Sequence, residues 1–82
     1  GGWSNTKIDD TIKTALNVVL KTNQTEGSLL KIVSAKKQVV NGMNYEITYT
    51  LKDGTTWNTI VYKSLSGAYS ITKAPHKINQ ST

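Results

Sequence analysis

The dipeptide Asn41-Gly42 restricts the fold of this chain more than any other feature, because it predicts a β-hairpin. Both residue types tolerate the positive φ angles of a type I′ turn, which joins two antiparallel strands through a two-residue loop. Val39 and Val40 come directly before the dipeptide. We therefore expect these valines at the exposed tip of a hairpin, where apolar side chains pack poorly but can enter the groove of a partner.

After this turn the sequence alternates between apolar and polar residues, as an antiparallel strand with one wet face does. The apolar members of the alternation are Tyr45, Ile47, Tyr49 and Leu51. Further turns are expected at Asp53-Gly54 and at residues 64–67, with a β-rich segment between them. The pattern predicts a four-stranded antiparallel meander over residues 28–73, and Trp3 could begin a short fifth strand at the sheet edge.

The N-terminal part has helical periodicity instead. Its apolar residues fall at spacings of three and four, which is typical of one helix face. They are Ile8, Ile12, Ala15, Leu16, Val19 and Leu20. We predict a helix over residues 7–23, capped by Thr6, with Asp9 and Asp10 near the positive end of its dipole.

One amphipathic helix can bury its apolar face by lying across one face of the sheet, which predicts a two-layer α+β fold. The 82 residues are expected to form a single domain, 1–82, with an N-terminal trunk at residues 1–6. Pro75 should end the last strand because proline cannot donate to a sheet ladder. Residues 74–82 are then expected to form a tail.

Composition argues against several function classes. All ten basic residues are lysine, and the formal charge is +5. Nucleic-acid readers rely on arginine for bidentate contacts, so we expect no nucleic-acid partner and interpret the lysines as a solvated surface that could attract an acidic partner. No apolar run is long enough to span a bilayer, so no membrane partner is expected.

The sequence contains few residues that could act in catalysis. His76 follows a proline in the expected tail and has no rigid support for general-base work. The five acidic residues are spread along the chain, and there is no cysteine, so we expect no metal site and no cofactor. The chain is therefore interpreted as a binding protein that is not an enzyme.

Three separated segments resemble one known family. Residues 38–42 resemble the Gln-Val-Val-Ala-Gly motif of the cystatins, inhibitors of papain-like cysteine proteases. Residues 1–4 resemble the Gly-Gly-Leu-Ser opening of the stefins, the cysteine-free branch of that family. Residues 61–67 resemble the Val-Phe-Lys-Ser-Leu-Pro-Gly segment of the second hairpin loop. One helix separates residues 1–4 from residues 38–42, and one hairpin separates residues 38–42 from residues 61–67, as in the family.

The resemblance implies a wedge that occludes the protease cleft reversibly and without a covalent bond. Gly2 would be a flexible pivot, Val39 and Val40 would lie over the catalytic centre, and Leu65 would contact the primed side. Gln38 and Gly42 would hold the first loop in shape. The expected protease-binding residues are Gly1, Gly2, Gln38, Val39, Val40, Asn41, Gly42, Leu65 and Ser66.

Two departures from the family pattern concern these loops. Asn41 stands where the family usually has alanine, which places a polar side chain at the expected interface. Ser66 stands where the family has proline, so the second loop should be less rigid.

The resemblance implies cathepsin-type proteases as partners and a monomer, with a domain-swapped dimer as the other possibility. A cystatin-fold binding module or engineered scaffold without inhibitory activity is the alternative function. The absence of cysteine and the stefin-like loops favour the cytoplasm, and secretion stays open.

Overall fold

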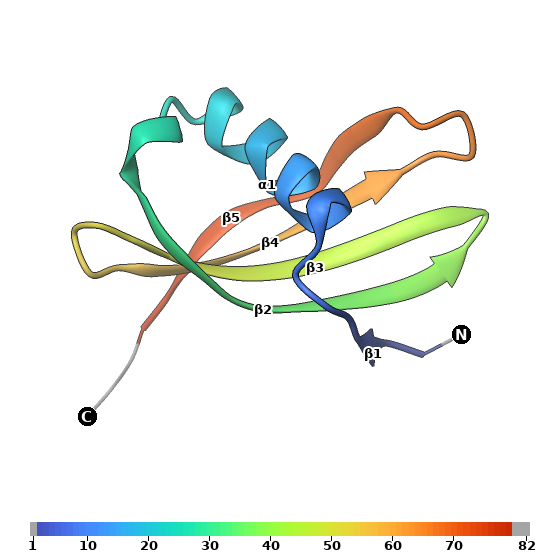
Figure 1. The fold of residues 1–82 in the computed structure, drawn as a ribbon, viewed down its shortest axis with the longest axis horizontal. Coiled ribbons are helices and arrows are strands. Elements are labelled where there is room, and N and C mark those ends of the chain that lie inside the picture. Colours follow the sequence, from blue (N-terminus) through green and yellow to red (C-terminus); the bar gives the residue numbers. More distant parts are fainter. Residues whose placement is uncertain (1, 80–82) are drawn as a thin grey trace.

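The structure is a computed structural model that describes residues 2–79. In this part, one α-helix lies across one face of a five-stranded antiparallel sheet (Figure 1), which confirms the predicted α+β fold. The strands lie side by side in chain order. They are β1 (Ser4–Asn5), β2 (Leu29–Val40), β3 (Gly42–Leu51), β4 (Thr56–Lys63) and β5 (Tyr69–Ile78). No helix of the described residues is long and apolar enough to cross a membrane.

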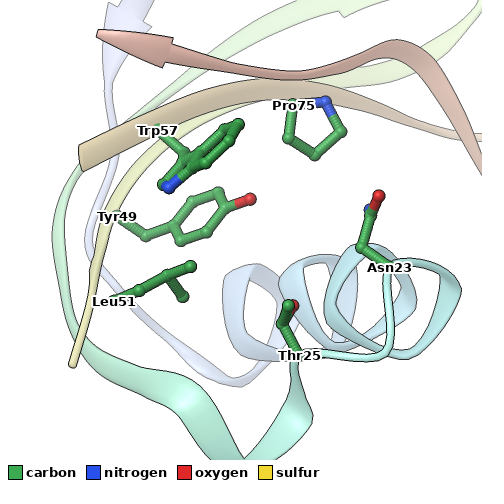
Figure 2. A pocket seen from close by; sticks show the side chains of 6 residues that line it. All are labelled: Asn23, Thr25, Tyr49, Leu51, Trp57 and Pro75. Atoms are coloured by element: carbon green, nitrogen blue, oxygen red, sulfur yellow. The ribbon is translucent and has the colours of Figure 1, made fainter. Parts of the chain in front are cut away.

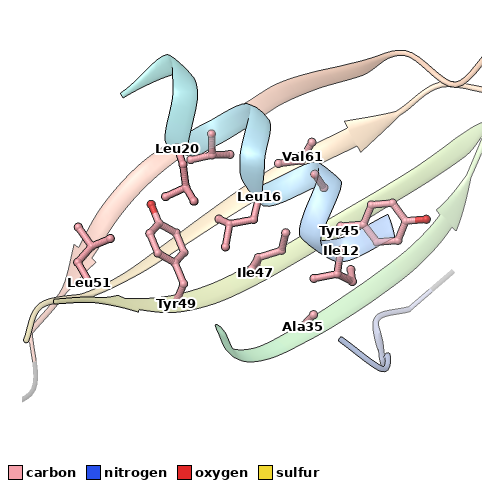
Figure 3. Close-up of a cluster of buried hydrophobic side chains, with 11 residues drawn as sticks. Ile12, Leu16, Leu20, Ala35, Tyr45, Ile47, Tyr49, Leu51 and Val61 are labelled. Atoms are coloured by element: carbon pink, nitrogen blue, oxygen red, sulfur yellow. The ribbon is translucent and has the colours of Figure 1, made fainter. Parts of the chain in front are cut away.

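The core lies between helix α1 (Asp10–Thr22) and the alternating face of β3. Figure 3 shows Ile12 and Leu16 of the helix on the side of the sheet that carries Ile47 of β3, and all three side chains are almost fully buried. Burying a side chain of this size contributes about 1.5–3 kcal/mol. The remaining buried members of the cluster are Ala15, Val19, Leu20, Ala35, Tyr45, Tyr49, Leu51 and Val61.

The helix begins later than the predicted range of residues 7–23, and its cap is not Thr6. Thr6 donates its backbone N–H to the carbonyl of Ala35 at 3.1 Å, so the chain is still tied to β2 at this point. The helix cap is Asp9, whose carboxylate accepts a hydrogen bond from the backbone N–H of Ile12 at 3.1 Å. The pairing with β2 therefore delays the helix until the next residue that can cap it.

The last strand continues through Pro75, where we expected it to end. The pairs Asn58↔His76 and Ile60↔Lys73 leave one more residue on β5 than on β4, so the proline lies in a bulge of an edge strand, where a missing donor is tolerated. Thr59 holds this bulge by donating its hydroxyl to the carbonyl of Lys73 at 2.8 Å. The predicted tail, residues 74–82, is therefore strand as far as Ile78, and residues 80–82 lie outside the described part.

Candidate functional site

Three segments that are far apart in the sequence meet at one end of the molecule. Figure 1 shows the dark blue N-terminal segment, the tip of the β2–β3 hairpin and the β4–β5 loop along the same end. Ser4 pairs with Lys37, two residues before Val39, so the segment that leads into β1 begins near the tip of the first hairpin. The sheet order then places the second loop beyond the first, because β4 lies next to β3. Gly1 lies outside the described residues.

The tip of the first hairpin is tighter than the predicted type I′ turn. Val40 pairs with Gly42, so Asn41 alone forms the connection between the strands. Gly42 has a φ of 113°, whereas Asn41 does not adopt a positive φ. The prediction of a two-residue loop is therefore wrong, because the loop is one residue long. Val39 and Val40 remain exposed next to this tip, at 67% and 42%.

A close contact between the first hairpin and β4 explains why Gly42 must be glycine. A Cβ atom at this position would lie 2.6 Å from the carbonyl oxygen of Lys63 and 2.7 Å from the hydroxyl of Tyr62. The Tyr62 hydroxyl also donates a hydrogen bond to the backbone carbonyl of Asn41. The neighbouring strand thus holds the peptide group at the hairpin tip. Tyr62 is not among the site residues expected from the sequence, because its contact depends on the register between β3 and β4.

A side-chain pair supports the same hairpin close to its tip. Gln38 and Asn44 are opposite each other on β2 and β3, and the Asn44 amide donates to the Gln38 side-chain oxygen at 3.1 Å. Cross-strand pairs of this kind stabilise a two-stranded ribbon locally. Gln38 is half-buried, so its side chain braces the hairpin more than it presents a contact surface.

The second loop is held by its own backbone and presents one apolar side chain. Ser64 donates its N–H to Ala68 at 2.8 Å, and Gly67 donates to the Ser64 carbonyl at 2.9 Å. Leu65, at 80%, is strongly exposed. The hydroxyl groups of Ser64 and Ser66 lie 2.8 Å apart in a hydrogen bond, so serine supplies a restraint of another kind at the position where the family has proline.

The ionisable groups near the turns and caps have structural partners. Asp53 accepts hydrogen bonds from the Thr55 backbone N–H at 2.9 Å and from the Thr55 hydroxyl at 2.5 Å. These bonds favour the charged form and lower the pKa of Asp53. Asp9 caps the helix as described above. In the part of the chain that the structure describes, no group of His, Asp and Glu residues is placed to hold a metal ion.

A pocket of about 220 Å³ lies at the opposite end of the fold, beside the end of the helix (Figure 2). It is lined by Asn23, Thr25, Tyr49, Leu51, Trp57 and Pro75. The Asn23 amide donates to the Val19 carbonyl at 2.9 Å, and the Trp57 indole N–H donates to the Thr55 hydroxyl at 2.8 Å. These donors serve the fold itself, and we assign no ligand to the pocket.

The protein is an α+β domain in which one helix packs on a five-stranded antiparallel sheet and three segments lie at the same end. The family model described as Cystatin domain matches residues 1–79, and the chain therefore belongs to the cystatin family. Comparison with curated proteins gives no significant match, nor does comparison with solved structures. Members of this family are inhibitors of cysteine proteases rather than enzymes. The absence of cysteine is consistent with the stefin branch.

Proposed function

We propose that this protein is a reversible, non-covalent inhibitor of papain-like cysteine proteases. The observation that carries the proposal is the alignment of three exposed segments at one end of the sheet, around Gly2, Val39 and Leu65. Their order across the sheet forms an edge that can enter a cleft. The expected partners are proteases of the cathepsin type, bound by one copy of the chain.

The apolar side chains of the two loops supply the affinity in this proposal. Val39, Val40 and Leu65 are exposed in the free protein, and burying each would contribute about 1.5–3 kcal/mol before ordering costs. Those costs are small where the backbone is already held. The Tyr62 hydrogen bond restrains the first loop, and the backbone bonds of Ser64 restrain the second.

The shape of the first hairpin explains why such an inhibitor would resist cleavage. A protease binds its substrate as an extended segment, whereas Asn41 connects two paired strands. Cleavage after Val40 would require the hairpin to open and the Tyr62 hydrogen bond to break. Inhibition would therefore come from exclusion of substrate and water.

Gly2 suits the role of a pivot. It is exposed, and an added Cβ atom there would have no neighbour within 4 Å, so the backbone is free to adjust to the cleft. Gly1 is proposed to take part in the same contact. Gln38 and Gly42 shape the first loop, while Asn41 and Ser66 lie at the tips that face the protease.

Titration of active papain with the purified protein tests this proposal. We expect loss of activity at near-equal concentrations, recovery of activity on dilution, and an intact chain in mass spectrometry after long incubation. A protein that leaves papain fully active would instead be a binding module without inhibitory activity. A covalent adduct, or cleavage between Val40 and Asn41, would contradict occlusion.

A pair of matched variants tests the contact residues. Replacing Val39 and Val40 together with Asp should weaken papain binding by about 2 kcal/mol or more, because buried charges would lack partners. Val33→Asp is the control, since Val33 is an unpaired bulge residue of the same strand, is 48% exposed and lies away from the tip. Equal losses of binding in both variants would contradict the assignment of the first loop.

A further inference from the structure

Asn41, at the tip of the first hairpin, is followed directly by a glycine. Asn41 is exposed, and it is the one asparagine in the chain that is followed by glycine. Its side-chain amide forms no hydrogen bond with the described residues. Asparagine is among the chemically labile residues, and a following glycine has no Cβ atom that would hinder attack on the side-chain carbonyl.

The reaction that this arrangement allows is deamidation. The backbone nitrogen of Gly42 attacks Cγ of Asn41, a five-membered succinimide forms, and the side-chain nitrogen leaves as ammonia. Water then opens the ring at either carbonyl and gives aspartate or isoaspartate. The net change is the gain of one water and the loss of one ammonia, and the product carries a new carboxylate.

The Tyr62 hydrogen bond controls the step that closes the ring. The Asn41 carbonyl, which accepts from Tyr62, belongs to the same peptide group as the attacking nitrogen of Gly42. Ring closure brings the Gly42 nitrogen onto Cγ of Asn41, and a hydrogen bond to the carbonyl of the same peptide group opposes movement of that group. Tyr62 is therefore a positioning residue that slows the reaction.

Asp53-Gly54 is an internal comparison, because aspartate before glycine can form the same ring. Its carboxylate, however, accepts two hydrogen bonds from Thr55, which restrict the movement of the side chain. The same bonds keep the carboxylate ionised, and a carboxylate is a poor electrophile. The Asn41 amide has neither restraint.

We propose that Asn41 is a site of spontaneous deamidation and that Tyr62 sets its rate. The functional consequence rests on the proposed inhibition. Deamidation places a negative charge between Val40 and Gly42, and the isoaspartate form adds a backbone atom to a one-residue connection. Both changes weaken an apolar contact that depends on a tight tip, so the protein is an inhibitor whose activity declines with age.

The chemistry is tested by ageing the protein in neutral buffer at body temperature and digesting it after lysine. The fragment 38–52 contains Asn41, and the fragment 53–63 contains Asp53. We expect fragment 38–52 to gain the mass of an amide-to-acid exchange at Asn41 and to become a substrate for isoaspartyl methyltransferase. Fragment 53–63 should not be methylated by this enzyme. An unchanged Asn41, or earlier conversion of Asn44 in the same fragment, would overturn the proposal.

Two variants test the role of Tyr62. Tyr62→Phe should deamidate several-fold faster at Asn41, while Tyr69→Phe, which removes a hydroxyl that forms no hydrogen bond with the described residues, should age like the parent. Circular dichroism establishes that both variants are folded. Equal rates in the parent and in Tyr62→Phe would overturn the control by Tyr62. Asn41→Ala provides the unreactive reference for the fragment.

The consequence for inhibition is measured separately. Ion exchange separates the aged form from the parent by its added charge, and each is titrated against papain. We expect the aged form to bind several-fold more weakly, and equal binding would overturn the functional consequence. If neither form inhibits papain, the proposed function fails, while the deamidation site is still decided by mass spectrometry.

Discussion

The hydroxyl of Tyr62 on β4 donates a hydrogen bond to the backbone carbonyl of Asn41, the single residue that connects β2 and β3. A tyrosine of one hairpin thus restrains the tip of the other. At the same contact, the ring and hydroxyl of Tyr62 occupy the space that a side chain at Gly42 would need. The shape of the first loop is therefore decided by its neighbouring strand as well as by its own turn residues.

Tyr62→Phe should loosen this tip without removing the aromatic ring. We expect the free energy of unfolding to fall by about 0.5–1.5 kcal/mol, the size of one hydrogen bond, and the complex with papain to dissociate faster. Denaturant unfolding and stopped-flow dissociation measure the two effects. Tyr69→Phe serves as the control. An unchanged dissociation rate would mean that the hydrogen bond does not organise the loop for binding.

Gly42→Ala should be far more harmful than Gly54→Ala. Both glycines have positive φ angles, at 113° and 88°, so both substitutions carry backbone strain of about 1–2 kcal/mol. Only at Gly42 would the new Cβ atom also meet the backbone of β4, at 2.6 Å. We expect Gly42→Ala to lose stability beyond this strain and to lose papain inhibition. Thermal unfolding that is equal for the two variants would contradict the close contact.

Leu65→Ala should weaken binding and leave stability almost unchanged. Leu65 is 80% exposed in the second loop, so its removal leaves no cavity in the free protein. Leu30→Ala is the matched control, because Leu30 is a 59% exposed leucine on β2. Calorimetric titration with papain should separate the two variants by at least about 1 kcal/mol. Identical affinities would remove the second loop from the proposed interface.

The alkaline limit of stability should depend on Tyr49. Burial raises the pKa of Tyr49 above its ordinary value, so the folded state holds this proton more tightly than the unfolded state does. The resulting stabilisation is fully present below about pH 10 and is lost as the pH rises through the raised pKa. The free energy of unfolding of Tyr49→Phe should therefore fall less steeply than that of the parent as the pH rises above about 10. Parallel stability curves for parent and variant would contradict the assignment.

The order of elements and the faces of the main segments follow from the sequence alone. The spacing of Ile12, Leu16 and Leu20 predicts one apolar helix face, and the alternation around Ile47 predicts a strand with one buried side. Both patterns depend on local geometry, with periods of 3.6 and 2 residues. The motif resemblance likewise identifies the family before any coordinates, because it depends on residue types and their spacing.

The tertiary structure decided the features that depend on contacts between distant segments. The helix begins after Asp9 because the backbone N–H of Thr6 is still hydrogen-bonded to the carbonyl of Ala35 on β2. The last strand passes Pro75 because β5 lies at a sheet edge and can bulge. The first turn has one residue because Gly42 pairs with Val40 and lies close against Tyr62 and Lys63 of β4. In each place, a contact with another element outweighs the local preference, and one sequence read along its length does not show which partner supplies that contact.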